Sequence, residues 1–231
     1  MRLGVVVGLA AEARIARRIG QVATGGGTPA GAEAAARRLV ADGATALLSF
    51  GLAGGLDPAL RAGKLLLPVE VLDDDTLYFT DPALIAGTPH GRLFAGTGVA
   101  VTAAEKAALW RRTRADGIDL ESGAVARVAT ERGLPFAVVR AVCDPAERSL
   151  PPGAVVALDQ SGAIGLWRVL GSVLRQPGQV SALLALGCDA ARARGSLLRY
   201  AAAATTDATM LRATASATRM PSTPADRMPP A

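Results

Sequence analysis

The sequence predicts a single α/β domain in which a mixed central β-sheet is flanked by helices. The chain has 231 residues, 50% of them hydrophobic, and its mean hydropathy is +0.30. A chain of this size and polarity can bury one substantial core. Short apolar runs rich in β-branched residues alternate with segments of helical periodicity, and this alternation is typical of α/β folds with much parallel pairing.

The first half of the chain carries strand and helix signals in turn. The predicted elements are strands at 3–9 and 46–50, helices at 11–19 and 31–42, and a glycine-rich break at 25–27. Two further strands are expected at 65–72 and 77–79, before a stretch rich in Pro and Gly at 81–91. This middle part favours antiparallel or mixed pairing.

The second half begins with a capping box. Thr102 and Glu105 have the spacing at which each side chain satisfies a free backbone N–H of the other, so a helix is expected over 103–113. The remaining expected elements are a helix from 122 to 133, a strand at 136–143, and two helical segments within 162–200 separated at 176–178. The catalytic domain is expected to span 1–200, and much of the Ala-, Thr- and Pro-rich stretch 201–231 is expected to be disordered.

Composition excludes several classes of function. The net charge is +5 with a pI near 10.0, but aromatic residues make up only 3% and the arginines are dispersed, which argues against nucleic acid binding. Two cysteines and one histidine are too few for a disulfide framework or a zinc site. Without a run of eighteen apolar residues or a signal-peptide pattern, the sequence favours the reducing cytoplasm.

Two carboxylates follow apolar runs. Asp144 comes at the end of the predicted strand 136–143, directly before Pro145, which blocks further ladder pairing. Glu121 lies just before the predicted helix that starts at 122. The carboxyl ends of strands are where open α/β sheets bind ligands, so both side chains are candidate site residues. The structural alternatives are a turn cap for Asp144 and a charge favourable to the helix dipole for Glu121.

Two glycine-rich segments are weaker signals. Gly51 to Leu56 follow an apolar strand, where backbone can approach a ligand closely. Gly25, Gly26 and Gly27 precede a helix, so their amides are candidates for anion binding, or they form a flexible turn. Neither segment matches a dinucleotide or P-loop motif.

The order of these segments resembles the superfamily of purine nucleoside phosphorylases and methylthioadenosine/S-adenosylhomocysteine nucleosidases over residues 3–200. The segments Gly-Leu-Ala-Ala-Glu at 8–12, Gly-Leu-Ala-Gly-Gly-Leu-Asp-Pro at 51–58 and Cys-Asp-Pro-Ala-Glu-Arg-Ser-Leu-Pro-Pro at 143–152 are most similar to the hopanoid-associated phosphorylase branch. The resemblance implies a three-layer α/β/α fold. It also implies release of adenine from a 5′-substituted adenosine, adenosylhopane in that branch, by phosphorolysis as a pentosyltransferase in hopanoid biosynthesis.

The resemblance also implies roles for individual residues. Asp144 matches the acid that protonates purine N7 as the base departs, and Glu121 matches the residue that holds the ribose hydroxyls. Substrate contacts are implied for Leu120, Ala53, Gly54, Val101 and Cys143. Val101 stands where an aromatic residue packs on the base in relatives, and it is also explained as plain core.

The nucleophile is left open. Glu12 is close to the position of the glutamate that activates water in nucleosidases, and it is also explained as a surface helix residue. Ser49 and Leu52 stand where hexameric phosphorylases carry phosphate ligands, so inorganic phosphate as co-substrate is expected to use Ser49 and the amides of Gly25, Gly26 and Gly27. No metal or other cofactor is expected.

Two rival functions follow from the same residues. One is hydrolysis by a methylthioadenosine/S-adenosylhomocysteine nucleosidase, and the other is a catalytically silent module that binds nucleosides. A small-molecule nucleoside, in one version lipid-linked, is the expected partner. The resemblance implies a homo-oligomer, and a lipid-linked substrate implies transient contact with the inner membrane surface.

Overall fold

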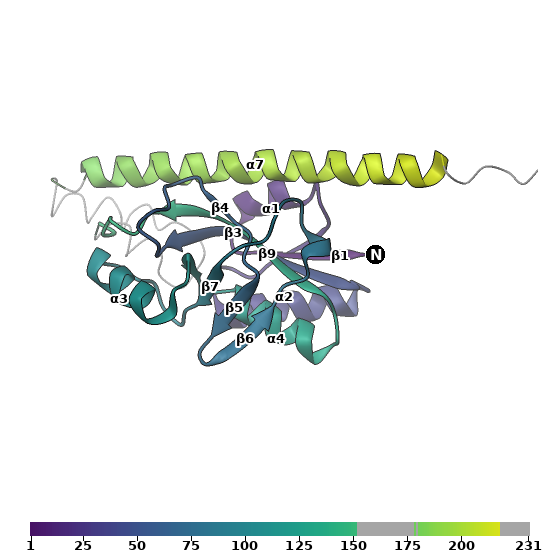
Figure 1. Cartoon of the computed structure of the whole chain (residues 1–231), viewed down its shortest axis with the longest axis horizontal. Coiled ribbons are helices and arrows are strands. Elements are labelled where there is room, and N and C mark those ends of the chain that lie inside the picture. Colours follow the sequence, from purple (N-terminus) through teal and green to yellow (C-terminus); the bar gives the residue numbers. More distant parts are fainter. Residues whose placement is uncertain (152–177, 179, 218–231) are drawn as a thin grey trace, which may run out of the picture.

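The computed structural model of the chain describes residues 1–151, 178 and 180–217. Its strands form one nine-stranded mixed sheet, with helices on both faces (Figure 1). The strands are β1 (Leu3–Val7), β2 (Gln21–Thr24), β3 (Ala46–Gly55), β4 (Leu65–Leu66), β5 (Glu70–Asp73), β6 (Thr76–Phe79), β7 (Arg92–Ala95), β8 (Gly117–Asp119) and β9 (Phe136–Asp144). The helices are α1 (Ala10–Ala16), α2 (Pro29–Ala41), the 3₁₀ helix η1 (Pro82–Leu84), α3 (Ala103–Thr113), α4 (Ser122–Glu131) and α7 (Val180–Ala217). The predicted three-layer α/β fold is confirmed.

Alternating side chains on the central strands fill two cores. Val6 of β1 belongs to the core under α2 and α4, whereas its neighbours Val5 and Val7 belong to the core under α1 and α7. The same alternation on β9 sends Val138 to the first core and Val139 to the second. This period of two is expected for strands buried on both faces. Helix α7 lies across the outer side of the second core (Figure 1).

β3 is the strand that organises the site. On one side it pairs in parallel with β9, from Leu47 opposite Phe136 to Gly54 opposite Asp144. On the other side it pairs in parallel with β1 up to Ser49, and then in antiparallel fashion with β8 at Gly54 and Gly55. Between those two ladders, the backbone of β3 has no strand partner on this side. A change of neighbour of this kind is where open sheets form ligand crevices.

Several predicted boundaries were wrong. The segment predicted as one strand over 65–72 is two strands, β4 and β5, separated around Pro68, which has no N–H to donate to a ladder. β3 runs to Gly55 and not to Phe50, because pairing with β9 and β8 holds its glycines extended. The short strands β2, β7 and β8 were not predicted at all, since three or four residues carry too little periodicity. Helix α3 has the predicted bounds and the predicted capping box.

Helix α7 extends into the stretch for which the sequence predicts disorder. The helix continues through Ala217, whereas disorder was expected for much of 201–231. Tyr200 and Ala201 are buried against the sheet, and the Tyr200 hydroxyl accepts a hydrogen bond from the Ala86 amide at 2.9 Å. Tertiary packing therefore holds the part of α7 around Tyr200 and Ala201 on the sheet. The helical segment predicted before 176 and the tail after 217 lie outside the described residues. None of the described helices is long and apolar enough to cross a membrane.

Candidate functional site

A buried guanidinium lies at the centre of the candidate site. Arg140, in the middle of β9, is 1% exposed, and its Nη2 lies 2.5 Å from Asp119 Oδ2 and 3.3 Å from Glu121 Oε2. The same nitrogen donates to Ser49 Oγ at 2.7 Å, and Ser122 Oγ donates to Asp119 Oδ2 at 2.6 Å. Burial alone would lower the pKa of Arg140, but its neighbouring carboxylates raise it, so the side chain is a permanent cation.

Two glycines open the space for this cluster. A Cβ at Gly51 would lie 2.7 Å from both Arg140 Nη1 and Glu12 Oε1, and one at Gly8 would lie 3.1 Å from both Glu121 carboxylate oxygens. Any side chain at Gly51 would displace the guanidinium that crosses β3 there. These glycines are therefore required by the close approach of charged side chains, whereas the sequence predicts the approach of a ligand at 51–56.

Glu12 is part of the cluster and not a surface residue. It is 3% exposed at the third position of α1, and its Oε2 accepts hydrogen bonds from the amides of Gly8 at 3.0 Å and Leu9 at 2.9 Å. Its Oε1 accepts from the Leu52 amide at 2.9 Å, in the unpaired stretch of β3. The carboxylate thus fills the gap between β1 and β8, which contradicts the surface-helix alternative for this residue.

Glu121 lies at the start of α4, on the β8 side of β3. Its side chain is almost fully buried, between Arg140 and the Gly27 amide, which donates to Oε1 at 3.3 Å. Burial raises the pKa of Glu121, Asp119 and Glu12 raise it further, and Arg140 opposes the rise. Three acidic side chains and one basic side chain from separate parts of the sheet and helices therefore meet at one place: Glu12, Asp119, Glu121 and Arg140.

Asp144 lies at the end of β9, as predicted, and β9 pairs with the edge of β3 that faces away from β8. Gly54 pairs with Asp144 on one side and with Ile118, three residues before Glu121, on the other. Asp144 is 6% exposed, and its Oδ2 lies 2.5 Å from the ammonium nitrogen of the fully buried Lys106. Its Oδ1 is buried with no hydrogen-bond partner. Burial raises the pKa of Asp144, and the hydrogen bond and charge of Lys106 oppose the rise.

The remaining predicted substrate contacts lie around these carboxylates. Ala53 is buried and Gly54 half-buried on β3, while Leu120 and Cys143 are half-buried beside Glu121 and Asp144. Burial raises the pKa of Cys143 to about 12, so its thiol is neutral. Val101 is half-buried, and its amide donates to Glu105 while its carbonyl accepts from Leu150, so its own backbone polar groups are occupied.

The predicted phosphate-binding groups are held by other parts of the protein. Gly25 donates its amide to the Val7 carbonyl at 2.8 Å, and Gly27 donates to Glu121. Gly26 is exposed, and Gly26 and Gly27 have φ values of 73° and 74°, which glycine adopts readily in a turn. Ser49 is fully buried against Arg140. The phosphate-binding role of these residues stays a prediction.

Sequence reasoning missed three charged residues of the site and gave none of them a role. Arg140 carried a usable signal, because a charged residue inside the apolar run 136–143 must find buried partners. Asp119 lies two residues before the predicted site residue Glu121, but only the fold brings it to Arg140. Lys106 carried no signal, since it follows the capping residue Glu105 on a helix whose neighbouring residues are mostly exposed. Among the described residues, no group of three His, Cys, Asp or Glu side chains has an arrangement suited to a metal ion.

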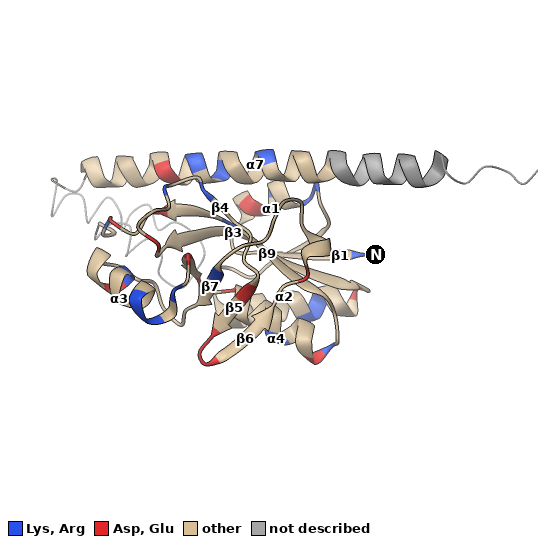
Figure 2. Ribbon diagram, viewed as in Figure 1, with Lys and Arg blue, Asp and Glu red and all other residues tan. Residues whose placement is uncertain are grey.

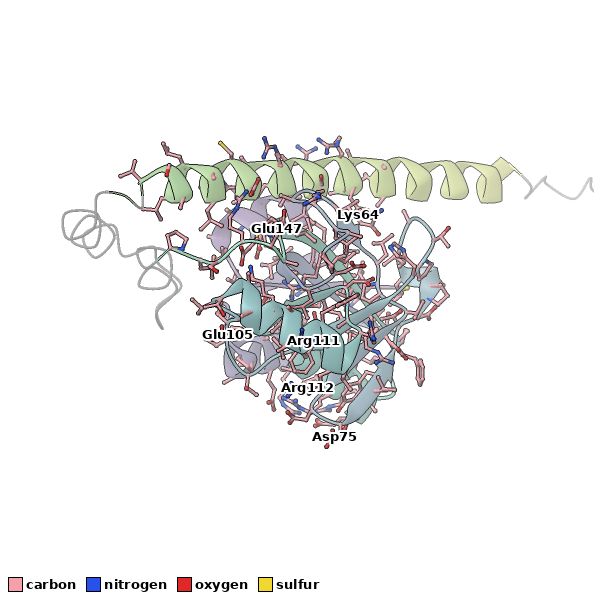
Figure 3. The ribbon with its side chains drawn as sticks, turned by 60° about the vertical axis from the view of Figure 1, so that its left-hand side comes forward. Lys64, Asp75, Glu105, Arg111, Arg112 and Glu147 are labelled. Atoms are coloured by element: carbon pink, nitrogen blue, oxygen red, sulfur yellow. The ribbon has the colours of Figure 1, made fainter. Side chains whose placement is uncertain are left out.

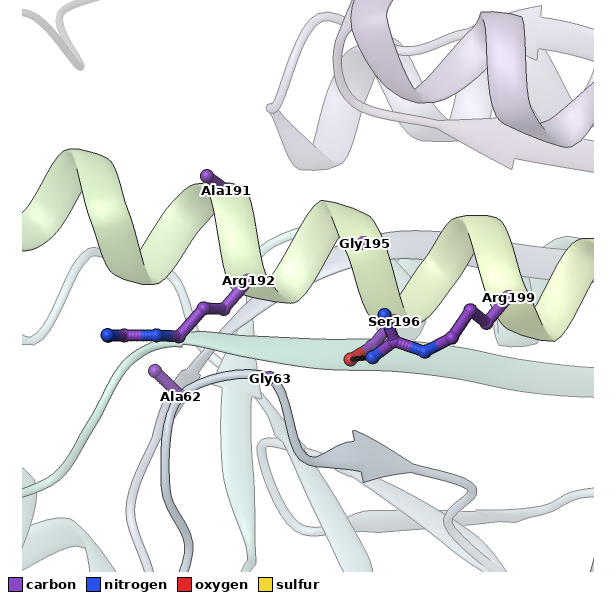
Figure 4. Close-up of a pocket in the computed structure, with 7 residues that line it drawn as sticks. All are labelled: Ala62, Gly63, Ala191, Arg192, Gly195, Ser196 and Arg199. Atoms are coloured by element: carbon purple, nitrogen blue, oxygen red, sulfur yellow. Dashed lines mark hydrogen bonds between the residues drawn. The ribbon is translucent and has the colours of Figure 1, made fainter.

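A separate surface pocket lies away from these residues. It is formed between α7 and the loop before β4, where Arg192 and Arg199 face Ala62 and Gly63 (Figure 4). Arg192 donates to Asp189 and Arg199 donates to Ser196, so both guanidinium groups already have partners within α7. None of the predicted site residues lines this pocket.

Comparison with known proteins identifies the fold of the domain as nucleoside phosphorylase- or nucleosidase-like. The family model described as "Phosphorylase superfamily" matches residues 85–161, which include α3, Glu121 and Asp144. A search of curated protein sequences finds no match.

Solved structures share the fold at low sequence identity. The native futalosine hydrolase of Helicobacter pylori has 16% identity and a TM-score of 0.58, with 76% of this chain and 98% of that chain covered. The 5′-methylthioadenosine/S-adenosylhomocysteine nucleosidase of the same organism has 17% identity and a TM-score of 0.58, with coverage of 76% and 98%. The corresponding nucleosidase of Colwellia psychrerythraea, in complex with adenine, has 15% identity and a TM-score of 0.58, with coverage of 74% and 95%.

Proposed function

We propose that this protein cleaves the N-glycosidic bond of a 5′-substituted adenosine and releases adenine. The observation that carries the proposal is the placement of Asp144 and Glu121, two buried carboxylates on opposite sides of Gly54, where β3 changes its strand partner from β1 to β8. The similarity to nucleosidase structures, one of them bound to adenine, supports the same reading.

The chemistry needs an acid on one side of the scissile bond. As the bond breaks, negative charge builds on the purine, and a proton delivered to N7 lets the base leave as neutral adenine. Asp144 suits this role because burial raises its pKa and its Oδ1 has no other partner.

The other side of the bond needs negative charge and hydroxyl ligands. Positive charge builds on the ribose in an oxocarbenium-like transition state, which a nearby carboxylate stabilises. Glu121 is placed for this role, with one oxygen toward Arg140 and the other toward Gly27. In this mechanism the ribose hydroxyls replace the long 3.3 Å contact between Gly27 and Glu121.

The surroundings of Glu12 favour water as the nucleophile. The amides of Gly8, Leu9 and Leu52 form the kind of donor set that binds anions, but the Glu12 carboxylate already occupies it. A phosphate dianion there would meet Glu12, Asp119 and Glu121, with only Arg140 to balance them among the described residues. A water molecule would instead find a carboxylate base, so hydrolysis, as in the similar nucleosidases, is the preferred reaction.

Phosphorolysis of adenosylhopane is the second candidate. Arg140 Nε is buried with no acceptor, which leaves one cationic donor for an anion, and the sequence motifs resemble the hopanoid-associated branch. In this candidate function the substrate is lipid-linked and reaches the enzyme at the cytoplasmic surface of a membrane. The enzyme is then a homo-oligomer. Exposed Leu184 and Leu198 lie on α7 together with the exposed Arg194, and Figure 2 shows basic residues along the described part of this helix. This combination suits an anionic lipid surface. Failure to co-sediment with anionic vesicles at low salt would count against this contact.

Adenine release separates these candidates. The wild-type protein is incubated with methylthioadenosine and with adenosylhopane, each with and without phosphate, and the sugar product is identified. Phosphate-independent release with a free sugar supports hydrolysis, and phosphate-dependent release with a sugar phosphate supports phosphorolysis. If the protein binds adenine but turns over neither nucleoside, the result supports a catalytically silent nucleoside-binding module. Asp75→Asn, on the exposed tip between β5 and β6, is the control that should behave as wild type (Figure 3).

A further inference from the structure

Lys106 is a fully buried lysine whose three N–H groups all have protein acceptors. Its Nζ donates to Asp144 Oδ2 at 2.5 Å, to the Arg148 carbonyl at 2.8 Å and to the Pro145 carbonyl at 3.1 Å. The next residue toward the N-terminus, Glu105, lies on the exposed side of α3 (Figure 3). Removing an ammonium from water is costly, so a buried lysine with this coordination has a specific function in the fold or the site.

The two oxygens of Asp144 are in different situations. Oδ2 is held by Lys106, whereas Oδ1 is buried and lacks a hydrogen-bond partner among the residues that the structure describes. A buried carboxylate oxygen without a donor is unfavourable and is rare in folded proteins. Oδ1 is therefore the atom of Asp144 that is available to a ligand. Lys106 makes this selection, because it occupies Oδ2.

We propose that Lys106 is the positioning residue of the reaction, which clamps Asp144 through Oδ2, directs Oδ1 to purine N7, and stabilises the carboxylate left after proton transfer. The inference rests on the proposed function. It assigns a role to α3, which otherwise contributes no group to the site.

The proton and electron balance is simple. As the bond between C1′ and N9 breaks, its electron pair goes to the purine, and the proton on Asp144 Oδ1 moves to N7. The cationic C1′ left behind is captured by water, which gives up its proton to Glu12. Adenine leaves neutral, and Asp144 becomes an anion beside the Lys106 ammonium at 2.5 Å. Lys106 therefore favours the side of the step on which the bond is broken.

The charged surroundings of Asp144 predict a change in pH dependence. Burial raises the pKa of Asp144, Lys106 and Arg148 oppose the rise, and Asp189 of α7 supports it. The neighbouring Cys143 is neutral because burial raises the pKa of its thiol to about 12. Loss of the Lys106 charge therefore raises the pKa of Asp144. Because the reaction needs protonated Asp144, the pH above which activity declines should move upward.

The test compares Lys106→Gln with Lys64→Gln, a substitution of the chain's other, exposed lysine (Figure 3). We expect Lys106→Gln to lower kcat for adenine release about tenfold to a hundredfold, to change KM little, and to shift the alkaline limb of the kcat profile upward. Lys64→Gln should match the wild type. An active Lys106→Gln protein with the wild-type kcat and the wild-type alkaline limb would overturn the inference.

A double substitution covers the case in which Lys106→Gln does not fold. Lys106→Met combined with Asp144→Asn removes both charges of the pair, so no unpaired buried charge remains. If Lys106 acts only through Asp144, this protein should release adenine at the rate of Asp144→Asn alone. A rate about tenfold or more below that of Asp144→Asn would overturn the positioning role. A wild-type protein that releases adenine from no nucleoside would instead remove the proposed function, and this inference with it.

Discussion

The carboxyl group of Asp144 must change its protonation state during the proposed reaction. We predict that Asp144→Asn, which keeps the shape of the side chain but carries no transferable proton, lowers kcat about 10²- to 10⁴-fold with little change in KM. Initial rates of adenine release measure both constants. A residual rate above a tenth of the wild-type rate would contradict the assignment of Asp144 as the acid.

The pH dependence of the wild type follows from the same group. Burial places the pKa of Asp144 above its ordinary value, and the protonated form is the active acid. Activity should therefore be high below this pKa and should fall as the pH rises through it, whereas Asp144→Asn should lack that limb. A wild-type alkaline limb that persists in Asp144→Asn would assign the titration to another group.

Glu12 distinguishes the two nucleophiles. If Glu12 activates water, Glu12→Gln should lower phosphate-independent adenine release about a hundredfold. If phosphate is the nucleophile, removing this negative charge should leave phosphate-dependent release unchanged or raise it, because the dianion meets one carboxylate fewer. Glu33→Gln on the surface of α2, where Glu33 pairs with Arg37, is the matched control and should behave as wild type.

At the scale of elements, α7 is tied to the loop that follows Asp144. The Asp189 side chain of α7 is buried and accepts from Arg148, which lies in that loop, and from Arg192 on its own helix at 2.7 Å. The carbonyl of Arg148 is in turn an acceptor of Lys106. The helix therefore supports the loop that supports the lysine.

We predict that Asp189→Asn weakens this support. The substitution leaves Arg148 without its anionic partner, so it should lower the free energy of unfolding by about 1–3 kcal/mol and reduce kcat without abolishing it. The matched control is Glu147→Gln, which breaks an exposed pair with Arg61 and should change stability by less than about 1 kcal/mol. Urea denaturation of both proteins measures the difference, and equal losses would argue against the support by α7.

In the whole molecule, α7 and α1 form the helical layer that covers the second core of the sheet. Leu197 is fully buried there, whereas its neighbour Leu198, about 100° further round the helix, is 43% exposed. Leu197→Ala should lower the free energy of unfolding by about 2–5 kcal/mol, and Leu198→Ala by less than about 1 kcal/mol. Urea unfolding midpoints test this pair, and similar effects of both substitutions would mean that α7 is not packed on the sheet as described.

The elements that the sequence predicted well have strong local signals. The capping box of Thr102 and Glu105 defines where α3 starts, and Pro145 defines where β9 ends. Local hydrogen-bonding chemistry specifies these boundaries without help from distant residues. The three-layer fold follows from the alternation of such segments, and the short strands β7 and β8 were missed because their pairing is decided by distant partners.

The sequence by itself determined the fold class and the candidates Asp144 and Glu121, because Asp144 ends an apolar strand-like run and Glu121 directly precedes a predicted helix. Only the tertiary structure decided how the charges are paired. The crossing of β3 between β9 and β8 brings Arg140 to Asp119, Glu121 and Ser49, and the packing of α3 brings Lys106 to Asp144. Ion pairs between residues far apart in the chain depend on distances of a few ångströms, and no local pattern of residue types encodes such distances.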